Sequence, residues 1–473
     1  MPRTRFALLA AALLAPAPAL AQQIRVKPEW PDLLVVAAGG VPDSREDGGM
    51  WSGRGLSARV RGGVRVDVGG VHLVLAPEAW HASNRPFDLL PGGDPSRSTF
   101  SSPYYFGANS LDLPMRMGMD PVTEISLGQS ALWEEWRKIA FGVATSTVSW
   151  GPGERQDLMF GHGAPGIPRL FVRTPRPVAT RYGRWSFDWF VGALSESRWF
   201  DRENSDDVRA LSAGSVTWSP RRDDNLAIGI ARAVQQTVPS SGDVLGHAFD
   251  FIRAAPEHRA DRMTSAFVRY VIPPAGMRVW MEIATPRPLG SLRDLLTIPG
   301  LDLAYQFGAE QFIGKDSTGW RVHAEAVSLE PGRMVRDEPQ HYFYAGRGTV
   351  HGWTQRGQLL GGDTGPGSNS QWLSVDRETP RWKLGGYGER VRWNNDILPT
   401  LYIPRYQRHD VTVRFGVRAA WHTALRGIPY DVALDASVGK RMNYLFQNTT
   451  WIDAYRTVDV NVPQLRLMVM PRR

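Results

Sequence analysis

Apolar and polar residues alternate with a period of two along most of this 473-residue chain. Successive side chains of a β-strand point to opposite faces, so each such run predicts a strand with one apolar face. The clearest runs span residues 64–68, 185–191, 226–230, 301–307, 320–324, 411–417 and 430–436. No helical stretch between them is long enough for a parallel βαβ crossover, so we predict an all-β, antiparallel fold.

Two antiparallel architectures fit this alternation: a sandwich in water and a barrel in a membrane. A barrel is favoured because the apolar faces carry Trp and Tyr at the ends of runs, while the opposite faces mix charge with Gly and Ala. The mean hydropathy of −0.29 is compatible with a barrel, whose strands average lipid-facing and lumen-facing residues. At about 25 residues per strand and connection, the chain supplies roughly 18 strands. We therefore predict a transmembrane antiparallel β-barrel over residues 56–473.

Four polar connections exceed hairpin turns and predict long extracellular loops, because the periplasmic turns of such barrels are short. These connections are Leu90–Ser102, Asp201–Val208, Gln236–Arg262 and Gly361–Gln371. The last alternating run, residues 460–469, is predicted to close the barrel. Pro463 within this run lacks an N–H, so we expect it at an edge or a bulge.

The first 55 residues lack the alternating pattern of the rest of the chain. Arg3 and Arg5 precede an apolar core at 6–14 and a small-residue site at 19–21, which predicts a cleaved signal peptide over residues 1–21. We therefore expect export to the outer membrane of a Gram-negative cell. Glycine and proline interrupt residues 22–55, which are predicted to form a short irregular or helical N-terminal segment that could act as a plug.

Charge is mixed rather than concentrated. The formal charge of +8 is spread without long basic runs, which argues against a nucleic-acid partner. The strand runs place five arginines and seven carboxylates on the face opposite the apolar one: Arg65, Arg278, Arg321, Arg414 and Arg418 against Asp67, Asp188, Glu282, Asp302, Glu325, Asp431 and Asp435. Buried charges of both signs must pair, so we predict a salt-bridged, partly filled lumen rather than an ion-selective pore. The excess positive charge then belongs to loops and rims, where it could meet lipopolysaccharide or acidic sugars.

Catalytic spacings are not evident in the sequence. It contains no HExxH, GxSxG or GxxxxGK[ST], its ten histidines are scattered singly, and it has no cysteine. We therefore predict no catalytic residue, no metal site and no cofactor, and expect that the protein is not an enzyme.

The stretch 150–168, WGPGERQDLMFGHGAPGIP, is too rich in Gly and Pro for a helix or a strand interior. Together with a second block further on, it resembles the capsule-assembly outer-membrane proteins of the Wzi type. The residues that carry the resemblance are Trp150, Gly151, Pro152, Gly153, Ala164, Pro165, Gly166 and Pro168, then Gly352, Trp353, Arg356, Gly357, Leu360 and Gly361. The chain departs from the family pattern at 161–163, where a pair of amides is expected, and at Trp353, where Tyr is expected.

This resemblance implies a plugged barrel whose outward loops bind capsular polysaccharide in a lectin-like way and retain it at the cell surface. It also implies surface polysaccharide, outer-membrane lipid and lipopolysaccharide as partners, and we expect a monomer. Aromatic residues beside planar hydrogen-bonding groups are candidates for sugar contact. These candidates are Trp353, Arg356, Trp372, Arg377, Tyr387, Arg390, Trp393 and Asn394.

Two alternatives remain from the residues themselves. A porin or sugar channel would have an open lumen and a measurable conductance. A barrel enzyme acting on lipid or polysaccharide would depend on one Ser, His or carboxylate, which the spacing of the sequence does not single out.

Overall fold

A computed structural model describes residues 24–43, 47–253, 259–286, 303–330, 343–398, 408–447 and 458–472. The predicted signal peptide over residues 1–21 lies outside the described residues, as does Asp302. Among the helices of the described part, none is long and apolar enough to cross a membrane.

The described strands and short 3-10 helices follow in chain order. They are β1 (Ile24–Ala38), β2 (Gly55–Val68), β3 (Val71–Leu75), β4 (Glu78–Ala82), η2 (Gly107–Asn109), β5 (Val122–Ser126), β6 (Ala131–Trp136), β7 (Ile139–Ala144), β8 (Arg169–Arg173), β9 (Val178–Thr180), β10 (Gly183–Ser195), β11 (Val208–Ser219), β12 (Leu226–Thr237), η3 (Val244–His247), η4 (Asp250–Ile252), β13 (Asp261–Ile272), η5 (Pro273–Ala275), β14 (Met277–Thr285), β15 (Ala304–Lys315), β16 (Thr318–Ser328), β17 (Thr354–Gln355), β18 (Gln358–Leu359), β19 (Asn369–Glu378), β20 (Trp382–Trp393), β21 (Asp410–Leu425), β22 (Ile428–Met442), η8 (Tyr444–Phe446), β23 (Val460–Asn461) and β24 (Gln464–Pro471).

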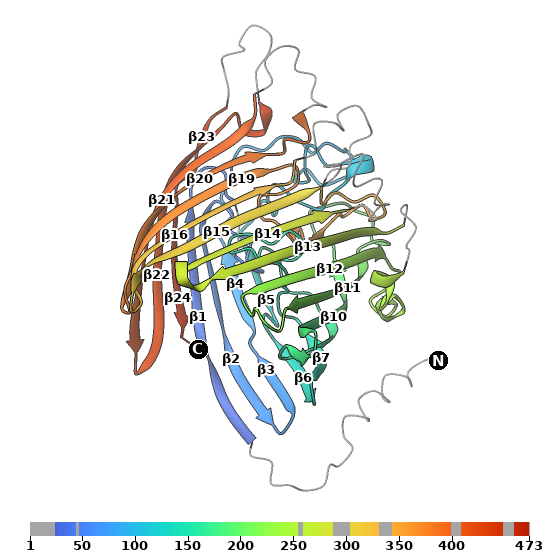
Figure 1. Ribbon diagram of the computed structural model, residues 1–473. Helices are drawn as coiled ribbons and strands as arrows, with labels where there is room; N and C mark the ends of the chain where they lie inside the picture. Colours follow the sequence, from blue (N-terminus) through green and yellow to red (C-terminus); the bar gives the residue numbers. More distant parts are fainter. Residues whose placement is uncertain are drawn as a thin grey trace, which may run out of the picture.

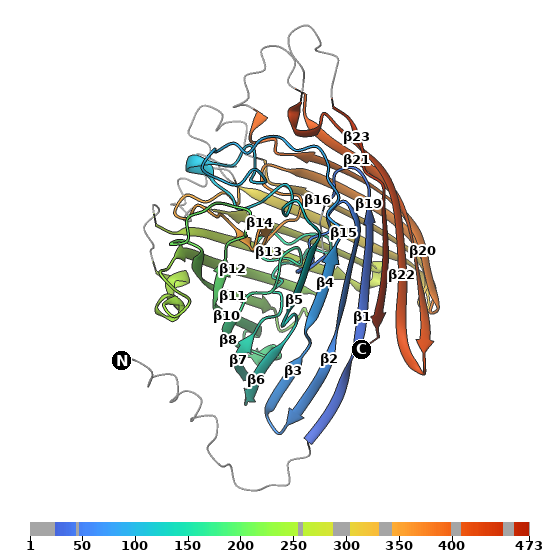
Figure 2. The same cartoon turned by 180° about the vertical axis from the view of Figure 1, so that it is seen from behind.

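All strands except the small β17–β18 hairpin belong to one closed antiparallel sheet (Figure 1). Its 22 strand segments make an 18-stranded barrel, because β3 and β4, β5 and β6, β8 and β9, and β23 and β24 each form one interrupted strand. The barrel closes where β1 pairs with β24, from Leu33 opposite Val469 to Ala38 opposite Gln464 (Figure 2). The predicted fold class and the strand number are confirmed, and Pro463 lies in the break between β23 and β24.

The prediction of an irregular segment over residues 22–55 is wrong for its first part. Residues 24–38 form β1, which pairs with β2 as well as β24, and so the barrel begins before residue 56. Two prolines interrupt the strand pattern of this segment in the sequence. The ladder between β1 and β2 shifts register between Glu29 and Asp32, which accommodates Pro31. The residues that follow β1 are irregular, and Met50 and Trp51 pack against the inner side of β1 and β4.

The connections differ in length between the two ends of the barrel. Turns such as 69–70, 137–138, 181–182, 316–317 and 426–427 join strands at one end, which also holds both ends of the described chain. The long connections lie at the other end, and their described parts include 83–121, 145–168, 196–207, 238–253 and 343–368. We call these the short-turn end and the long-loop end. The four predicted long loops all fall at the long-loop end, which corresponds to the extracellular side of such barrels.

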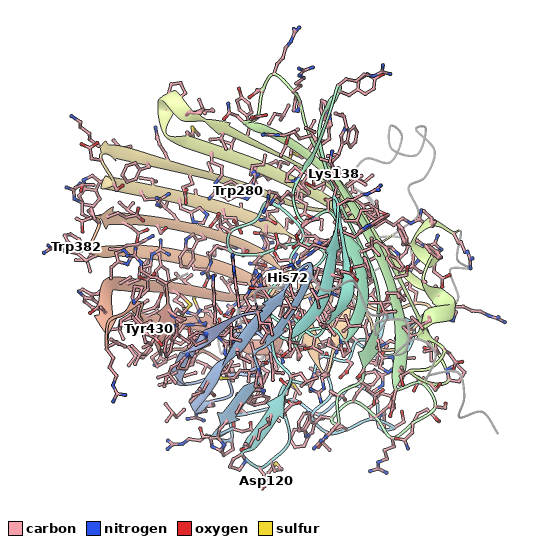
Figure 3. The ribbon with its side chains drawn as sticks, turned by 90° about the horizontal axis from the view of Figure 1, so that it is seen from below. His72, Asp120, Lys138, Trp280, Trp382 and Tyr430 are labelled. Atoms are coloured by element: carbon pink, nitrogen blue, oxygen red, sulfur yellow. The ribbon has the colours of Figure 1, made fainter. Side chains whose placement is uncertain are left out.

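The outward face of the barrel suits lipid. Large apolar side chains on it are exposed, for example Ile125 (79%) and Phe415 (64%). Exposed aromatic residues gather beside the short turns: Trp136, Tyr182, Trp185, Trp320, Trp382 and Trp421. Seen from below, Trp382 lies at the periphery of the barrel, whereas His72 and Trp280 project into its interior (Figure 3). This aromatic girdle marks one membrane–water interface, as the run-end Trp and Tyr residues predicted.

A charge in the middle of the outward face tests this assignment. Val417 is 61% exposed and lies halfway along β21, so Val417→Arg should place a cation in hydrocarbon. We expect the free energy of unfolding to fall by about 2–4 kcal/mol in a denaturant titration of the protein refolded into lipid bilayers. Val417→Leu is the control and should change little. An unchanged unfolding free energy in Val417→Arg would show that this face does not lie in the membrane.

Candidate functional site

The two Gly- and Pro-rich blocks of the sequence lie side by side inside the barrel. Residues 150–168 connect β7 to β8, and residues 343–367 lie between β16 and β19; we call them the first and second crossing segments. The Gly161 N–H donates to the Leu360 carbonyl over 2.7 Å, and the Trp353 Nε1–H donates to the Met159 carbonyl over 2.8 Å. Two loops that begin far apart around the barrel therefore meet in its interior.

An aromatic cluster forms the core of this contact. Ring centroids lie 5.2 Å apart for Trp150 and Phe160, 5.6 Å for Phe160 and Phe190 of β10, and 5.7 Å for Phe160 and Trp353. Such pairs contribute about 0.5–1.5 kcal/mol each beyond the burial of area. Trp353 is 2% exposed, so a sugar cannot reach its face. The hypothesis that Trp353 binds polysaccharide is wrong, because its indole is a core group.

Carboxylates on the barrel wall hold the backbone of the first crossing segment. Glu325 of β16 accepts hydrogen bonds from the three consecutive N–H groups of residues 154–156, over 3.1, 3.3 and 3.2 Å. Glu282 of β14 accepts the N–H of Leu158 over 3.4 Å. A loop inside a barrel has no ladder partner, and each buried donor left unsatisfied costs about 1–3 kcal/mol. The wall thus supplies the acceptors that this backbone needs.

Close backbone approach explains two glycines of the motif. A Cβ on Gly153 would lie 1.9 Å from the Gln156 carbonyl oxygen, and one on Gly361 would lie 2.4 Å from the carbonyl oxygen of Leu158. Both distances are far inside van der Waals contact. The motif therefore needs glycine at these positions so that the crossing segments can fold and meet.

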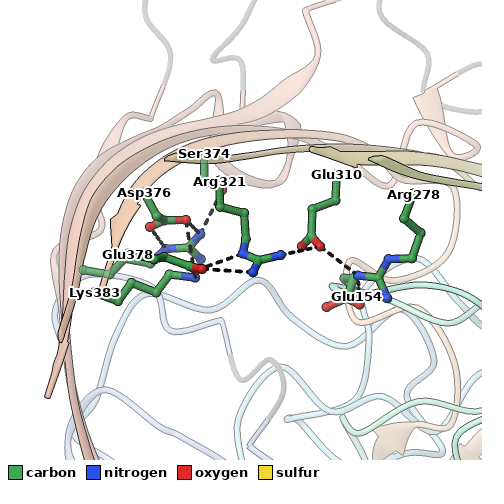
Figure 4. Close-up of polar contacts among 9 residues, drawn as sticks. Glu154, Arg278, Glu310, Arg321, Ser374, Asp376, Glu378 and Lys383 are labelled. Atoms are coloured by element: carbon green, nitrogen blue, oxygen red, sulfur yellow. Dashed lines mark hydrogen bonds and ion pairs between the residues drawn. The ribbon is translucent and has the colours of Figure 1, made fainter. Parts of the chain in front are cut away.

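The charges of the lumen pair with one another, as predicted (Figure 4). Arg321 contacts Glu378 at 2.9 Å and Glu310 at 2.6 Å. Glu310 also lies 3.4 Å from Arg278, which in turn pairs with Glu154 of the first crossing segment. The other three predicted arginines are paired too: Arg65 with Asp67, Arg414 with Asp43 and Glu389, and Arg418 with Asp376.

Trp372 and Tyr387, two sugar-contact candidates, form a stack on the inner wall. Their rings lie 4.1 Å apart at 24°, and the Arg155 guanidinium of the first crossing segment lies 3.9 Å from the Trp372 ring centre. They line a cavity of about 290 Å³. Its walls include Arg155, Trp372, Tyr387, Arg414, Arg418 and Arg466. Because Lys383 also lines it, this cavity extends towards the short-turn end, away from the extracellular loops.

The three candidate arginines lie far apart. Arg356 pairs with Glu124 on the inner side of β5. Arg377 lies on the outward face at the short-turn end, 5.6 Å from the Trp320 ring centre, so the hypothesis that it joins an extracellular sugar site is wrong. Arg390 lies near the long-loop end of β20 and donates to an amide oxygen on β19 over 2.9 Å.

Trp393 and Asn394 line a pocket at the long-loop end, which we call the outer pocket. It has a volume of about 190 Å³, and both crossing segments contribute to its walls. The Tyr105 hydroxyl donates to the Asn394 side-chain oxygen over 3.1 Å. The Trp393 Nε1–H donates to Thr412 over 2.9 Å, which fixes the plane of the indole.

Arg441 organises the aromatic wall of the outer pocket. Its guanidinium lies 4.7 Å from the Trp393 ring centre and 4.8 Å from that of Tyr444. Two hydrogen bonds to Asp410, of 2.8 and 2.7 Å, hold it there. Burial raises the pKa of Tyr444 to about 12, so its hydroxyl stays neutral and can donate.

Sequence reasoning missed four residues of the outer pocket: Tyr104, Tyr105, Arg441 and Tyr444. The available signal was the pair of adjacent tyrosines that follows the predicted loop Leu90–Ser102 after one proline. Their partners lie near residues 394 and 444. The alternation of apolar and polar residues is a local pattern and does not predict contacts between residues so far apart in the chain.

No protein-family model matches this chain, and no curated protein matches its sequence. Among solved structures, the Escherichia coli protein described as Wzi, an outer membrane protein involved in group 1 capsule assembly and a carbohydrate binding β-barrel, superposes with a TM-score of 0.59 at 11% identity, over 94% of this chain and 85% of that one. OccD3 (OpdP) of Pseudomonas aeruginosa matches at 0.46 and 10% identity, over 94% of this chain and 92% of its own. OccK11 (OpdR) of the same organism matches at 0.45 and 9%, over 95% and 96%. The likeness to Wzi supports the fold of an outer-membrane barrel, and membership of the Wzi-type family stays a prediction.

Removing one wall carboxylate tests how the first crossing segment is held. Glu325→Ala leaves the N–H groups of residues 154–156 without their acceptor, so their hydrogen exchange should speed up roughly tenfold or more. Exchange measured by mass spectrometry on the refolded barrel reports this change. Asp431→Ala removes a wall carboxylate that pairs with His422 and Arg472 instead, and should leave these amides as they are. Equal exchange in Glu325→Ala and wild type would contradict the role assigned to Glu325.

Proposed function

We propose that this protein binds a capsular or related surface polysaccharide at its long-loop end and helps to anchor or assemble it at the cell surface, without catalysis. The observation that carries the proposal is the outer pocket, which lies above crossing segments held within the barrel. A protein that retains a polymer needs a binding site that is accessible from the outer side. It does not need an open channel through the barrel.

The chemistry of the outer pocket suits a sugar. The partly exposed Trp393 offers a ring face and Asn394 offers a polar side chain, while Tyr105, Arg441 and Tyr444 are buried behind them and hold the wall in place. Sugars combine apolar C–H faces with hydroxyls, so they are recognised by aromatic stacking and planar polar groups together. Because the pocket is small, one site would bind weakly, and the repeats of a polymer held by many barrels would add strength through multivalency.

The filled lumen supports retention over conduction. The first crossing segment is bonded to β14 and β16, and the second reaches β10, where the Ser195 N–H donates to Gln355 over 2.8 Å. Both segments therefore span the interior and have partners on the walls that they reach. A porin would need this space for its passage.

The outer rim suits an anionic surface. Arg390 and Arg392 lie on the outward side of β20 near the long-loop end, and the Arg392 Nε lies 3.2 Å from Glu330. Lipopolysaccharide phosphates would meet these cations at the level of the lipid headgroups. Lipopolysaccharide as a second partner and a monomeric barrel belong to this proposal.

The indole of Trp393 provides the test of the pocket. Trp393→Ala should weaken binding to surface polysaccharides on a glycan array roughly tenfold, because about 1–1.5 kcal/mol of stacking is lost. Trp382→Ala removes an exposed indole at the short-turn end and should bind as wild type does. Heat-modifiable migration on gels confirms that both variants are folded. If both variants bind equally well, the outer pocket is not the sugar site.

Planar-bilayer recording tests the filled lumen. The refolded protein should give no stable single-channel steps at neutral pH and high salt, because the crossing segments occupy the passage. Regular porin-like steps in wild type would instead establish the channel function and overturn retention as the main role.

A further inference from the structure

Three ionisable side chains from two separate loops converge at the long-loop end. Glu196 and Asp206 belong to the 196–207 connection between β10 and β11, and His351 belongs to the second crossing segment. One candidate ligand atom from each residue lies within 4.8 Å of the other two. The His351 Nε2 and the Glu196 Oε2 are 2.6 Å apart. Sequence patterns do not reveal this group, because its members are separated by up to 155 residues.

Two atoms of the group are buried without a hydrogen-bond partner among the described residues. They are the His351 Nδ1 and the Asp206 Oδ1. The His351 ring is 0% exposed, and the Glu196 side chain is 8% exposed. Buried polar atoms are nearly always paired, so the Asp206 Oδ1 needs a partner such as an ion. The His351 Nε2 faces Glu196, so an ion there would bind Nε2 and would leave Nδ1 unpaired.

The surroundings are rich in negative charge. Asp112, Asp201 and Asp207 lie close enough to Glu196 to act on it electrostatically. The nearby Arg209 guanidinium does not pair with Glu196, because it donates to the carbonyls of Gly352 and Thr354 over 2.9 Å each.

We propose that Glu196, Asp206 and His351 bind a divalent transition-metal ion, with Zn²⁺ as the ion that fits best. One imidazole nitrogen and two carboxylates are ordinary ligands of Zn²⁺, and a water molecule would complete four-coordination. Ligand atoms about 2.0–2.2 Å from one ion lie about 3.3 Å apart in a tetrahedron, so the His351–Glu196 contact opens slightly when the ion enters.

The ion would join the 196–207 loop to the second crossing segment. His351 directly precedes Gly352, whose carbonyl accepts hydrogen bonds from Arg209 and from Gln235 over 2.9 and 2.7 Å. A metal ion bound at His351 therefore adds a link at the long-loop end to the second crossing segment, which is already bonded to β11 and β12.

Isothermal titration calorimetry with ZnCl₂ tests the proposal on the full-length barrel, refolded in detergent and treated with chelator. Wild type should bind one equivalent, and Asp206→Asn and His351→Gln should each bind at least tenfold more weakly. Asp206→Asn replaces a carboxylate whose buried oxygen has no partner, so it keeps the test valid if His351→Gln fails to fold.

The matched control is His422→Gln. It removes a histidine that also lies 2.6 Å from a carboxylate, Asp431, at the short-turn end, and it should bind zinc as wild type does. The proposal is overturned if wild type shows no saturable zinc binding, if Asp206→Asn binds as tightly as wild type, or if CaCl₂ binds more tightly than ZnCl₂.

Discussion

Closure of the sheet between β1 and β24 is the constraint on which the rest of this structure depends. Hydrocarbon offers no hydrogen bonds, so an open edge would leave a row of N–H and C=O groups unsatisfied, each at a cost of several kcal/mol. Six residue pairs, from Leu33 opposite Val469 to Ala38 opposite Gln464, remove that edge. Once the sheet is closed, every strand has one face towards lipid and one towards the lumen, which is why the sequence alternates for so long.

Closure creates a second problem, because a barrel of 18 strands encloses more space than its own side chains fill. Here two loops fold inward, and their backbone groups need partners that no ladder provides. Glu325 and Glu282 meet this need from the wall, and the aromatic cluster around Phe160 buries the apolar side chains of the loops. The mixed charge of the lumen is thus part of the packing, since each of the five predicted lumen arginines has a carboxylate beside it and other wall carboxylates bind backbone.

How much the sequence predicts depends on the range of the interaction. Strands such as β12 and β21 follow from alternation, which is local, and so does the break at Pro463. The first strand was missed because Pro28 and Pro31 interrupt its pattern, whereas the ladder tolerates them through a shift in register. Trp353 and Trp393 look alike in sequence, as aromatic residues beside turn-forming ones. Only the fold separates them, because Trp353 is buried and bonded to the Met159 carbonyl, 194 residues away, whereas Trp393 lines a pocket with Tyr444.

The shape of the outer pocket depends on the segments that cross the middle of the barrel. Gly163 and Asp363 of the crossing segments form part of its floor, while Trp393 and Arg441 stand on strands of the wall. Floor and wall are joined at the pocket, where the Asn395 N–H donates to the Gly367 carbonyl over 2.9 Å, and deeper in the lumen, where Glu325 and Glu282 bind the first crossing segment. A pocket built in this way is preorganised only as far as the crossing segments are fixed, and loss of order there costs affinity without any change in the groups that touch the ligand. The charged lumen thus acts on the outer surface by holding the floor of the outer pocket in place.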